Sequence, residues 1–373
     1  MSTTAFGALT DLQRKVWAKK TNKDGRDQSF WMSNSLVGSN TDDHNRPVQK
    51  ITELSRSADG SGDKVIMNIV HDLQKDGIVG DAQLTGNEEA MNAEAITLNV
   101  DLLRHGVKSA GEMNEQRTVI AFRKTAKERL SFWLADSLDE MMFLVASGRA
   151  LTLNTDGSTR ADTSWSTFTF ASDVAAATTN RILHAGTASG ESTLTASDTM
   201  SWDLLIAAKT KAVRKRIRPI RAGGKPYYVI VLSPEQCRDL KQDSDYQAAV
   251  SRGQSRGKGN PLFTGEEVTV DGLVIYEHNK VYNTFGLTSS NKWGSSGTVD
   301  GAQALLMGAQ ALGFASVSDP FWKEADITDY GNQPGIAYGQ IIGLLKPQFQ
   351  SSVDANTTED YGVISVKTAA AET

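Results

Sequence analysis

The stretch that decides the fold is residues 94–148, EAITLNVDLLRHGVKSAGEMNEQRTVIAFRKTAKERLSFWLADSLDEMMFLVASG. Apolar residues at 96, 98, 100 and 102 alternate with polar residues at 97, 99 and 101, and this period of two predicts a half-buried strand over 94–103. After glycines at 106 and 111 the apolar period lengthens to three to five residues, and neither Pro nor Gly occurs in 113–147. The sequence therefore predicts a strand followed by one long amphipathic helix that ends at Gly148.

A helix over 113–147 would be about 50 Å long. A single-layer domain has little need for such a helix, whereas a plate-like subunit that tiles a surface can use it as a support. The apolar side of the helix is expected to form its core contacts through Val119, Phe122, Leu130, Trp133, Leu138 and Met141.

The charges of this helix are unevenly distributed. Its first half is basic, with Arg117, Arg123, Lys124, Lys127 and Arg129, and its second half carries Asp136, Asp139 and Glu140. One interpretation is a solvated or salt-bridged helix face. The other is that the basic half contacts phosphates without reading nucleotide sequence.

A second strand over 64–70 is expected to pair with the strand over 94–103 and form a long hairpin. A two-stranded ribbon is at best marginally stable in water unless another surface covers its apolar face. The hairpin therefore packs either on its own domain or on a neighbouring copy of the chain. The tip residues expected at such a contact are Gly77, Gly80, Asp81, Leu84, Gly86, Glu88 and Glu89.

Composition excludes several classes of protein. The chain has 373 residues, 39% hydrophobic and 22% charged, and its net charge of -5 argues against a dedicated nucleic-acid binder. The single cysteine, Cys237, excludes an internal disulfide framework. No signal peptide is apparent, and no apolar run approaches the ~20 residues that span a bilayer. We expect a soluble protein that is intracellular when it is made and has no membrane partner.

The remaining segments are predicted from local patterns. Residues 1–63 are predicted to form an extended arm with a short helix over Leu9–Lys19, and 149–199 to contain a helix near Val174–Leu183. Further helices are expected over 201–216 and from Ser233, where Ser-Pro-Glu-Gln supplies an N-cap and a Pro at the first helical position. Residues 241–265 are expected to form a polar loop. Strands are expected over 226–232, 268–277, 304–312, 336–345 and 362–368.

Ordered motifs along the chain resemble the major capsid proteins of tailed phages of the N-four type. In the first half they are GIVGD at 77–81, LTGNEE at 84–89, GEMNEQRT at 111–118 and LSFWL at 130–134. In the second half they are RPIR at 218–221, YYVIVLSP at 227–234, NPLFTG at 260–265 and DGLVIYE at 271–277. The resemblance covers residues 50–345.

This resemblance implies an α+β chain with the Hong Kong 97-type capsid fold. The implied parts are an N-terminal arm (1–60), an extended β-hairpin loop (61–111), a peripheral domain (112–199) with the spine helix (113–147), an axial domain (200–330), and return strands with a C-terminal tail (331–373). The implied function is that of a major capsid protein, which assembles into hexamers and pentamers of an icosahedral head enclosing double-stranded DNA. Its implied partners are copies of itself, portal and decoration or scaffolding proteins, and the packaged DNA, in virions assembled in the bacterial cytoplasm.

The resemblance also implies that the loop from Lys241 to Gly265 lies near the capsomer axis. Symmetry would then bring several copies of Arg252, Arg256 and Lys258 close together, and their repulsion needs compensation. Pairing with Glu266 and Glu267 of a neighbour is one solution, and a fully solvated, screened loop is the other.

Two alternatives remain at this point: a cellular nanocompartment shell of the same fold, and a soluble α/β enzyme. The five histidines form no metal-binding pair at helical spacing, and neither a phosphate loop nor a nucleophile elbow occurs. Cys237 in the first turn of a helix could have a lowered pKa, but a buried structural thiol is the simpler interpretation. We expect no catalytic residue, cofactor or metal.

Overall fold

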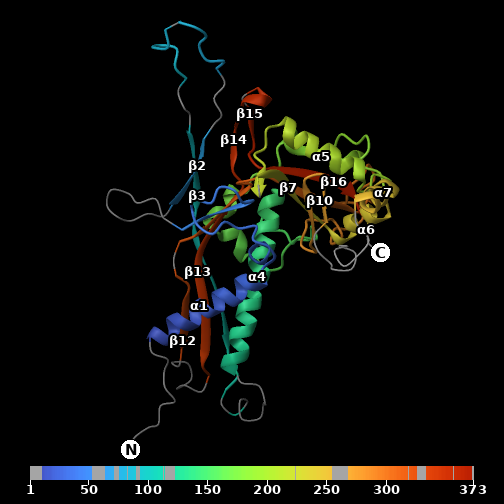
Figure 1. Cartoon of the computed structure of the whole chain (residues 1–373). Coiled ribbons are helices and arrows are strands. Elements are labelled where there is room, and N and C mark those ends of the chain that lie inside the picture. The colour runs from blue at the N-terminus through green and yellow to red at the C-terminus, as the bar shows by residue number, and fades with distance from the viewer. Residues whose placement is uncertain are drawn as a thin grey trace, which may run out of the picture.

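The computed structural model describes residues 11–52, 64–70, 75–81, 83–89, 93–111, 113, 122–222, 224–253, 268–317, 319–325, 333–355 and 357–371. Figure 1 shows a long helix beside a long strand, a ribbon projecting beyond them, and a second helix-covered sheet to one side. In the part of the chain that is described, no helix is long and apolar enough to cross a membrane.

The projecting ribbon consists of β2 (Lys64–Val70) and β3 (Ala93–Asn99). The two strands pair antiparallel from Lys64 opposite Asn99 to Val70 opposite Ala93, which confirms the expected hairpin. The apolar side of the ribbon packs on its own subunit, in a small cluster composed of Ile51, Val65, Met67, Leu98, Ala315 and Leu345. The paired strands therefore do not depend on a neighbour for their cover.

The prediction of one strand over 94–103 is wrong at Val100. The chain leaves the ribbon there, and β4 (Asp101–Lys108) pairs with β13 (Gly335–Leu345) in a different sheet. The burial pattern changes phase with the sheet, because Leu102 is 41% exposed whereas Leu103 is buried. A pattern of period two cannot reveal such a change of partner, because side chains alternate in the same way in both sheets.

The five-stranded sheet surrounds the long strand β13. One edge of β13 pairs with β4, and its other edge pairs first with β12 (Phe321–Ala325) and then with β11 (Leu312–Ser316). Parallel to β11 lies β1 (Val48–Ile51), so the N-terminal region completes this sheet.

The long helix α4 (Phe122–Ser147) has 26 residues and lies beside the five-stranded sheet (Figure 1). It ends at Gly148, where φ is +66°, as the sequence predicts. The expected N-terminal turns of this helix fall on 114–121, outside the described residues.

The N-terminal region differs from the predicted extended arm. Helix α1 (Asp11–Gln28) has 18 residues rather than the expected short helix, and it packs against α4. Helix α2 (Phe30–Ser33) follows α1 in the chain. Gly25 permits the contact of α1 with α4, because a Cβ there would lie 3.0 Å from a methyl carbon of Leu134. Tertiary packing therefore overrides the low helix propensity of glycine and asparagine in this segment.

Residues 149–199 contain no α-helix at 174–183, contrary to the prediction. Instead they form short 3-10 turns, η1 (Ser164–Thr167), η2 (Thr169–Asp173), η3 (Thr179–Arg181) and η4 (Glu191–Thr193), and the short strand β5 (Ile182–His184). Because this segment is rich in Ser, Thr and Gly, side-chain hydrogen bonds to the backbone compete with helix formation.

A seven-stranded sheet forms the second part of the molecule. Its order is β5, β16 (Val363–Ala369), β10 (Gly301–Met307), β7 (Lys225–Leu232), β9 (Leu273–Glu277) and β8 (Val268–Val270), with β6 (Ile220–Ala222) also paired to β7. Three helices belong to this part: α5 (Trp202–Arg214), α6 (Pro234–Gln242) and α7 (Ser244–Gly253). A small hairpin of β14 (Gln348–Ser351) and β15 (Thr357–Asp360), joined through η6 (Ser352–Asp354), was not expected.

Local helix signals in this part are confirmed. Ser201 accepts a hydrogen bond from the Leu204 backbone, and Ser233 and Gln236 form a reciprocal capping box. The polar loop expected over 241–265 is wrong for its first part, because α7 continues to Gly253.

The two sheets do not follow the boundaries inferred for the domains. Strands β11 and β12 fall within 200–330 but belong to the five-stranded sheet, whereas β16 near the C-terminus returns to the seven-stranded sheet. The segment 304–312, predicted as one strand, is divided between the two sheets. Strand β10 ends at Met307 in the seven-stranded sheet, and β11 begins at Leu312 in the five-stranded sheet.

Candidate subunit interface

The tip of the ribbon, residues 75–81 and 83–89, stands clear of the rest of the subunit in Figure 1. Val79 is 89% exposed and Leu84 is 61% exposed. A Cβ added to Gly77, Gly80 or Gly86 would meet no atom within 4 Å, and all three glycines have positive φ. Two large apolar side chains are thus exposed on a loop that projects from the subunit.

Contacts within the tip give it a defined shape. The backbone N–H of Lys75 donates to a Glu89 carboxylate oxygen at 2.8 Å, and that of Gly86 donates to Glu88 at 2.7 Å. Asp81 is exposed between these turns. All seven tip residues singled out in the sequence therefore lie on this loop.

The core of α4 is largely as predicted. Leu130, Leu138 and Met141 are buried, and Phe122 is partly buried. Trp133 is only half-buried and stacks on the His105 ring of β4 at 4.6 Å between centroids, so it lies at the edge of the core. Val119 lies outside the described residues.

The basic half of α4 is partly paired. Arg123 forms an ion pair with Glu324 at 3.0 Å, and Lys127 forms one with Asp24 of α1. Lys124 remains exposed, and Arg117 lies outside the described residues. Arg129 is likewise exposed, so the described half contains two paired and two unpaired cations and does not form one free basic surface.

The acidic half of α4 anchors other segments. Asp139 is buried and accepts hydrogen bonds from the Ser29 hydroxyl at 2.6 Å and the Phe30 backbone at 2.8 Å. Burial raises the pKa of its carboxyl, and these hydrogen bonds lower it in part. The sequence prediction missed this anchor, although a serine directly before an aromatic pair could have suggested a contact.

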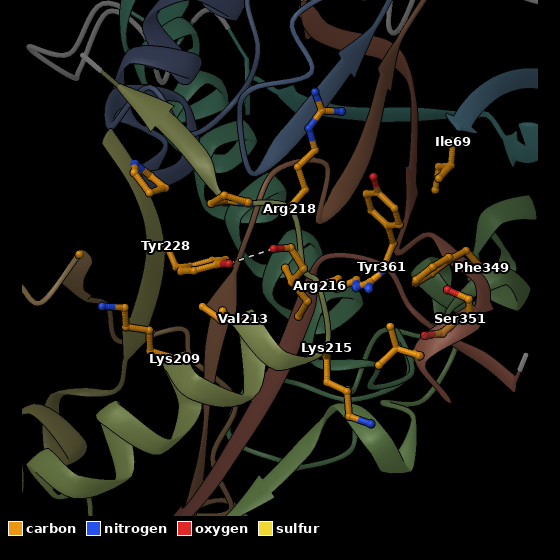
Figure 2. A pocket seen from close by; sticks show the side chains of 16 residues that line it. Ile69, Lys209, Val213, Lys215, Arg216, Arg218, Tyr228, Phe349, Ser351 and Tyr361 are labelled. Atoms are coloured by element: carbon orange, nitrogen blue, oxygen red, sulfur yellow. Dashed lines mark hydrogen bonds between the residues drawn. The ribbon is translucent and has the colours of Figure 1, made fainter. Parts of the chain in front are cut away.

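A groove of about 900 Å³ lies between α5 and the β14–β15 hairpin (Figure 2). Val213 and Lys215 line it from the α5 side, and Phe349 and Ser351 line it from β14. Arg216 follows the C-cap of α5, Lys215, and adopts a left-handed backbone conformation with φ +53°. No local pattern in the sequence indicates this groove, because its walls come from distant segments.

A family model described as phage capsid protein matches residues 7–372. The chain belongs to the phage capsid protein family. A curated relative, the major capsid protein of Pseudomonas phage KPP25, is 41% identical over 375 residues, which cover 98% of each chain. The enzyme hypothesis is thereby set aside, since this family consists of structural proteins.

Solved capsids support the fold of this capsid protein. The capsid of Ralstonia phage GP4 has a TM-score of 0.76 at 24% identity, covering 100% of this chain and 96% of that chain. The capsid of cyanophage Pam1 has a TM-score of 0.69 at 20% identity, covering 100% of both chains. The expected Hong Kong 97-type capsid fold is confirmed.

The single cysteine, Cys237, is buried in α6. Burial, reinforced by Glu277, raises the pKa of the Cys237 thiol to about 12, so this capsid protein holds it as a neutral thiol. The residues that the structure describes contain no group of three or more His, Cys, Asp or Glu side chains that could hold a metal.

The loop expected near the capsomer axis is described only at its start. Arg252 belongs to α7, while Arg256, Lys258, Glu266 and Glu267 lie outside the described residues.

Proposed function

We propose that this chain is the major capsid protein of a tailed phage, and that it assembles into capsomers of five and six copies in an icosahedral head around double-stranded DNA. The observation that carries the proposal is the ribbon tip, whose apolar residues are exposed although the strands beneath it are well packed. A protein that acts alone has no use for such a loop. A subunit of a shell can use it to bind its neighbour.

The full-length similarity to the KPP25 major capsid protein supports this proposal. In this proposal the ribbon is the extended loop and α4 is the spine helix. The five-stranded sheet belongs to the peripheral domain and the seven-stranded sheet to the axial domain. Portal, scaffolding or decoration proteins are further expected partners, and the site of action is the virion, after assembly in the bacterial cytoplasm.

DNA contact is proposed for one face of the spine helix. Lys124 and Arg129 of α4 are exposed and form no ion pair with any residue that the structure describes, and Arg117 belongs to the same basic stretch of the sequence. Such contacts would neutralise phosphates without reading sequence.

The end of α7 and the residues that follow it are proposed to lie at the capsomer axis. There Arg252, Arg256 and Lys258 of one subunit would pair with Glu266 and Glu267 of the next. Exchanging both arginines for glutamate should impair capsomer formation, and adding lysines at 266 and 267 should restore it in part. Unimpaired assembly of the arginine variant at low salt would show that the loop faces solvent.

The test of the proposed function is assembly of the purified chain, examined by negative-stain electron microscopy and sedimentation. Closed shells or isolated rings of five and six subunits are the expected products. Shells from infected cells should contain DNA that resists nuclease until the shell is opened, whereas protein cargo would indicate a nanocompartment. A chain that remains a monomer at all concentrations and salt conditions would contradict the proposal.

A further inference from the structure

The groove beside α5 carries positive charge that the described part of its own subunit does not neutralise. Lys209 is paired with Asp271, and Lys215 is paired with Asp354. Arg216 and Arg218 are exposed and form no ion pair with any residue that the structure describes. The groove therefore presents two free guanidinium groups.

Apolar side chains lie beside these charges. Val213 is 57% exposed and Val353 is 39% exposed, and both line the groove. In Figure 2 Val213 and Arg216 lie on the side of α5, opposite Phe349 of the small hairpin. The surface that fits this groove is acidic at some positions and apolar at others.

The backbone at Arg216 is unfavourable for arginine. Its N–H donates to the Val213 carbonyl at 3.1 Å, and the next N–H, of Ile217, donates to Ala212 at 3.0 Å, which is the Schellman arrangement that ends a helix. Glycine is the usual residue at this left-handed position. The chain has arginine there, so the charge is retained at a conformational cost.

The ribbon tip has the complementary character. Asp76 and Asp81 are exposed and form no ion pair with any described residue. Val79 and Leu84, the two large exposed apolar side chains of the tip, lie on the same loop. Four carboxylates and one lysine occur in residues 75–89, so the tip is acidic.

We propose that the ribbon tip of one subunit binds in the groove beside α5 of the next subunit of the same capsomer. Asp76 and Asp81 then pair with Arg216 and Arg218, while Val79 and Leu84 pack near Val213 and Val353. This inference rests on the proposed function. Because tip and groove are different surfaces of one chain, the contact is heterologous and repeats around a ring. It fixes the direction and register of the ring.

Charge exchange tests the contact. The groove variant carries Arg216→Glu with Arg218→Glu, and the tip variant carries Asp76→Arg with Asp81→Arg. Each should raise the subunit concentration needed for assembly by about fivefold or more, most strongly at low salt, since two ion pairs become repulsive contacts. Both pairs of changes in one chain should restore assembly, and Arg104→Glu with Lys108→Glu, at exposed positions of β4, is the charge-matched control for the groove variant.

Mixing the two variants tests whether the contact runs within a ring. Every contact between unlike variants is then attractive, and every contact between like variants is repulsive. A ring of six can alternate completely, whereas a ring of five must contain one repulsive contact. The mixture should therefore form six-fold rings, sheets or tubes in place of closed shells.

The variant Arg216→Gly distinguishes an effect of the lost charge on assembly from an effect on folding. Glycine relieves the left-handed strain, so the isolated subunit should melt at the same temperature as the parent or higher, while its assembly weakens. Parental assembly of this variant and of the groove variant would overturn the inference, as would failure of the combined charge exchange to restore assembly. If the parent itself forms no shells or rings, the proposed function fails instead.

Discussion

At the scale of single residues, His278 shows how the fold sets a charge state. Its ring lies 4.6 Å from the Phe30 ring and 4.9 Å from the Phe143 ring, and its Nδ1 accepts a hydrogen bond from the Lys280 backbone. Burial lowers the pKa of His278 from 6.5 to about 4; Lys280 adds to this effect and Asp136 opposes it. The imidazole is therefore neutral in the folded subunit at neutral pH.

A defined pH dependence follows. The unfolded chain binds a proton at His278 below about pH 6.5, whereas the folded chain binds it only below about pH 4. The contribution of neutral His278 to the free energy of unfolding is therefore fully present above pH 6.5 and is lost as the pH falls from 6.5 to 4. We expect His278 to account for roughly 2 kcal/mol of this loss, allowing for its partial exposure. Denaturant unfolding at pH 7 and pH 4.5 should show a smaller loss for His278→Phe than for the parent. Equal losses in the two proteins would contradict the prediction.

Neighbouring residues of α4 should differ strongly in their effect on folding. Leu134 is fully buried against α1, whereas Phe132 is 59% exposed. Leu134→Ala should destabilise the isolated subunit by about 3 kcal/mol, through lost transfer energy and a cavity. Phe132→Ala should cost less than about 1 kcal/mol. Thermal and urea unfolding of the unassembled variants compare the two, and similar costs would mean that this face of the helix is wrongly placed.

At the scale of elements, the ribbon separates into two parts with different support. Its strands pack on their own domain, so folding does not depend on the tip. Replacing residues 71–92 with a short turn between the paired Val70 and Ala93 should leave a folded subunit but abolish shells. Circular dichroism, the melting temperature and sedimentation together test this prediction. Normal shells from the shortened chain would show that the tip makes no essential contact.

The end of α4 depends on one glycine. A Cβ at Gly148 would lie 2.5 Å from the Ala175 carbonyl oxygen, and φ there is +66°. Gly148→Ala should therefore destabilise the subunit by more than about 2 kcal/mol, combining backbone strain with a steric clash. Gly224→Ala is the matched control, because φ there is +80° but no atom lies within 4 Å of the added Cβ. A smaller effect at Gly148 than at Gly224 would contradict this account.

At the scale of the whole molecule, the ion pairs decide how the DNA proposal can be tested. Lys127 holds α1 through Asp24, so its reversal would disturb the subunit itself. Lys124 is exposed, and Lys124→Glu should leave subunit stability and empty shells unchanged but weaken DNA retention as salt rises. Nuclease protection and particle density measure the retained DNA. Retention equal to the parent at every salt concentration would reject a contact at Lys124.

The structural features that the sequence determined by itself are local or periodic ones. The capping box at Ser233, the end of α4 at Gly148 and the pairing of 64–70 with the following strand depend on residues near one another in the chain or on simple alternation. The ordered motifs identified the family because they run through much of the chain in a constant order. These features can be predicted from the sequence without knowing which distant segments are in contact.

Only the tertiary structure decided which distant segments meet. The change of sheet at Val100, the docking of α1 on α4 through Gly25, and the pairing of Lys127 with Asp24 each require a partner that no local pattern names. The groove beside α5 is of the same kind, because its two sides lie more than a hundred residues apart. Burial and ion pairing are properties of surfaces brought together by folding, so a residue type and its spacing do not reveal them.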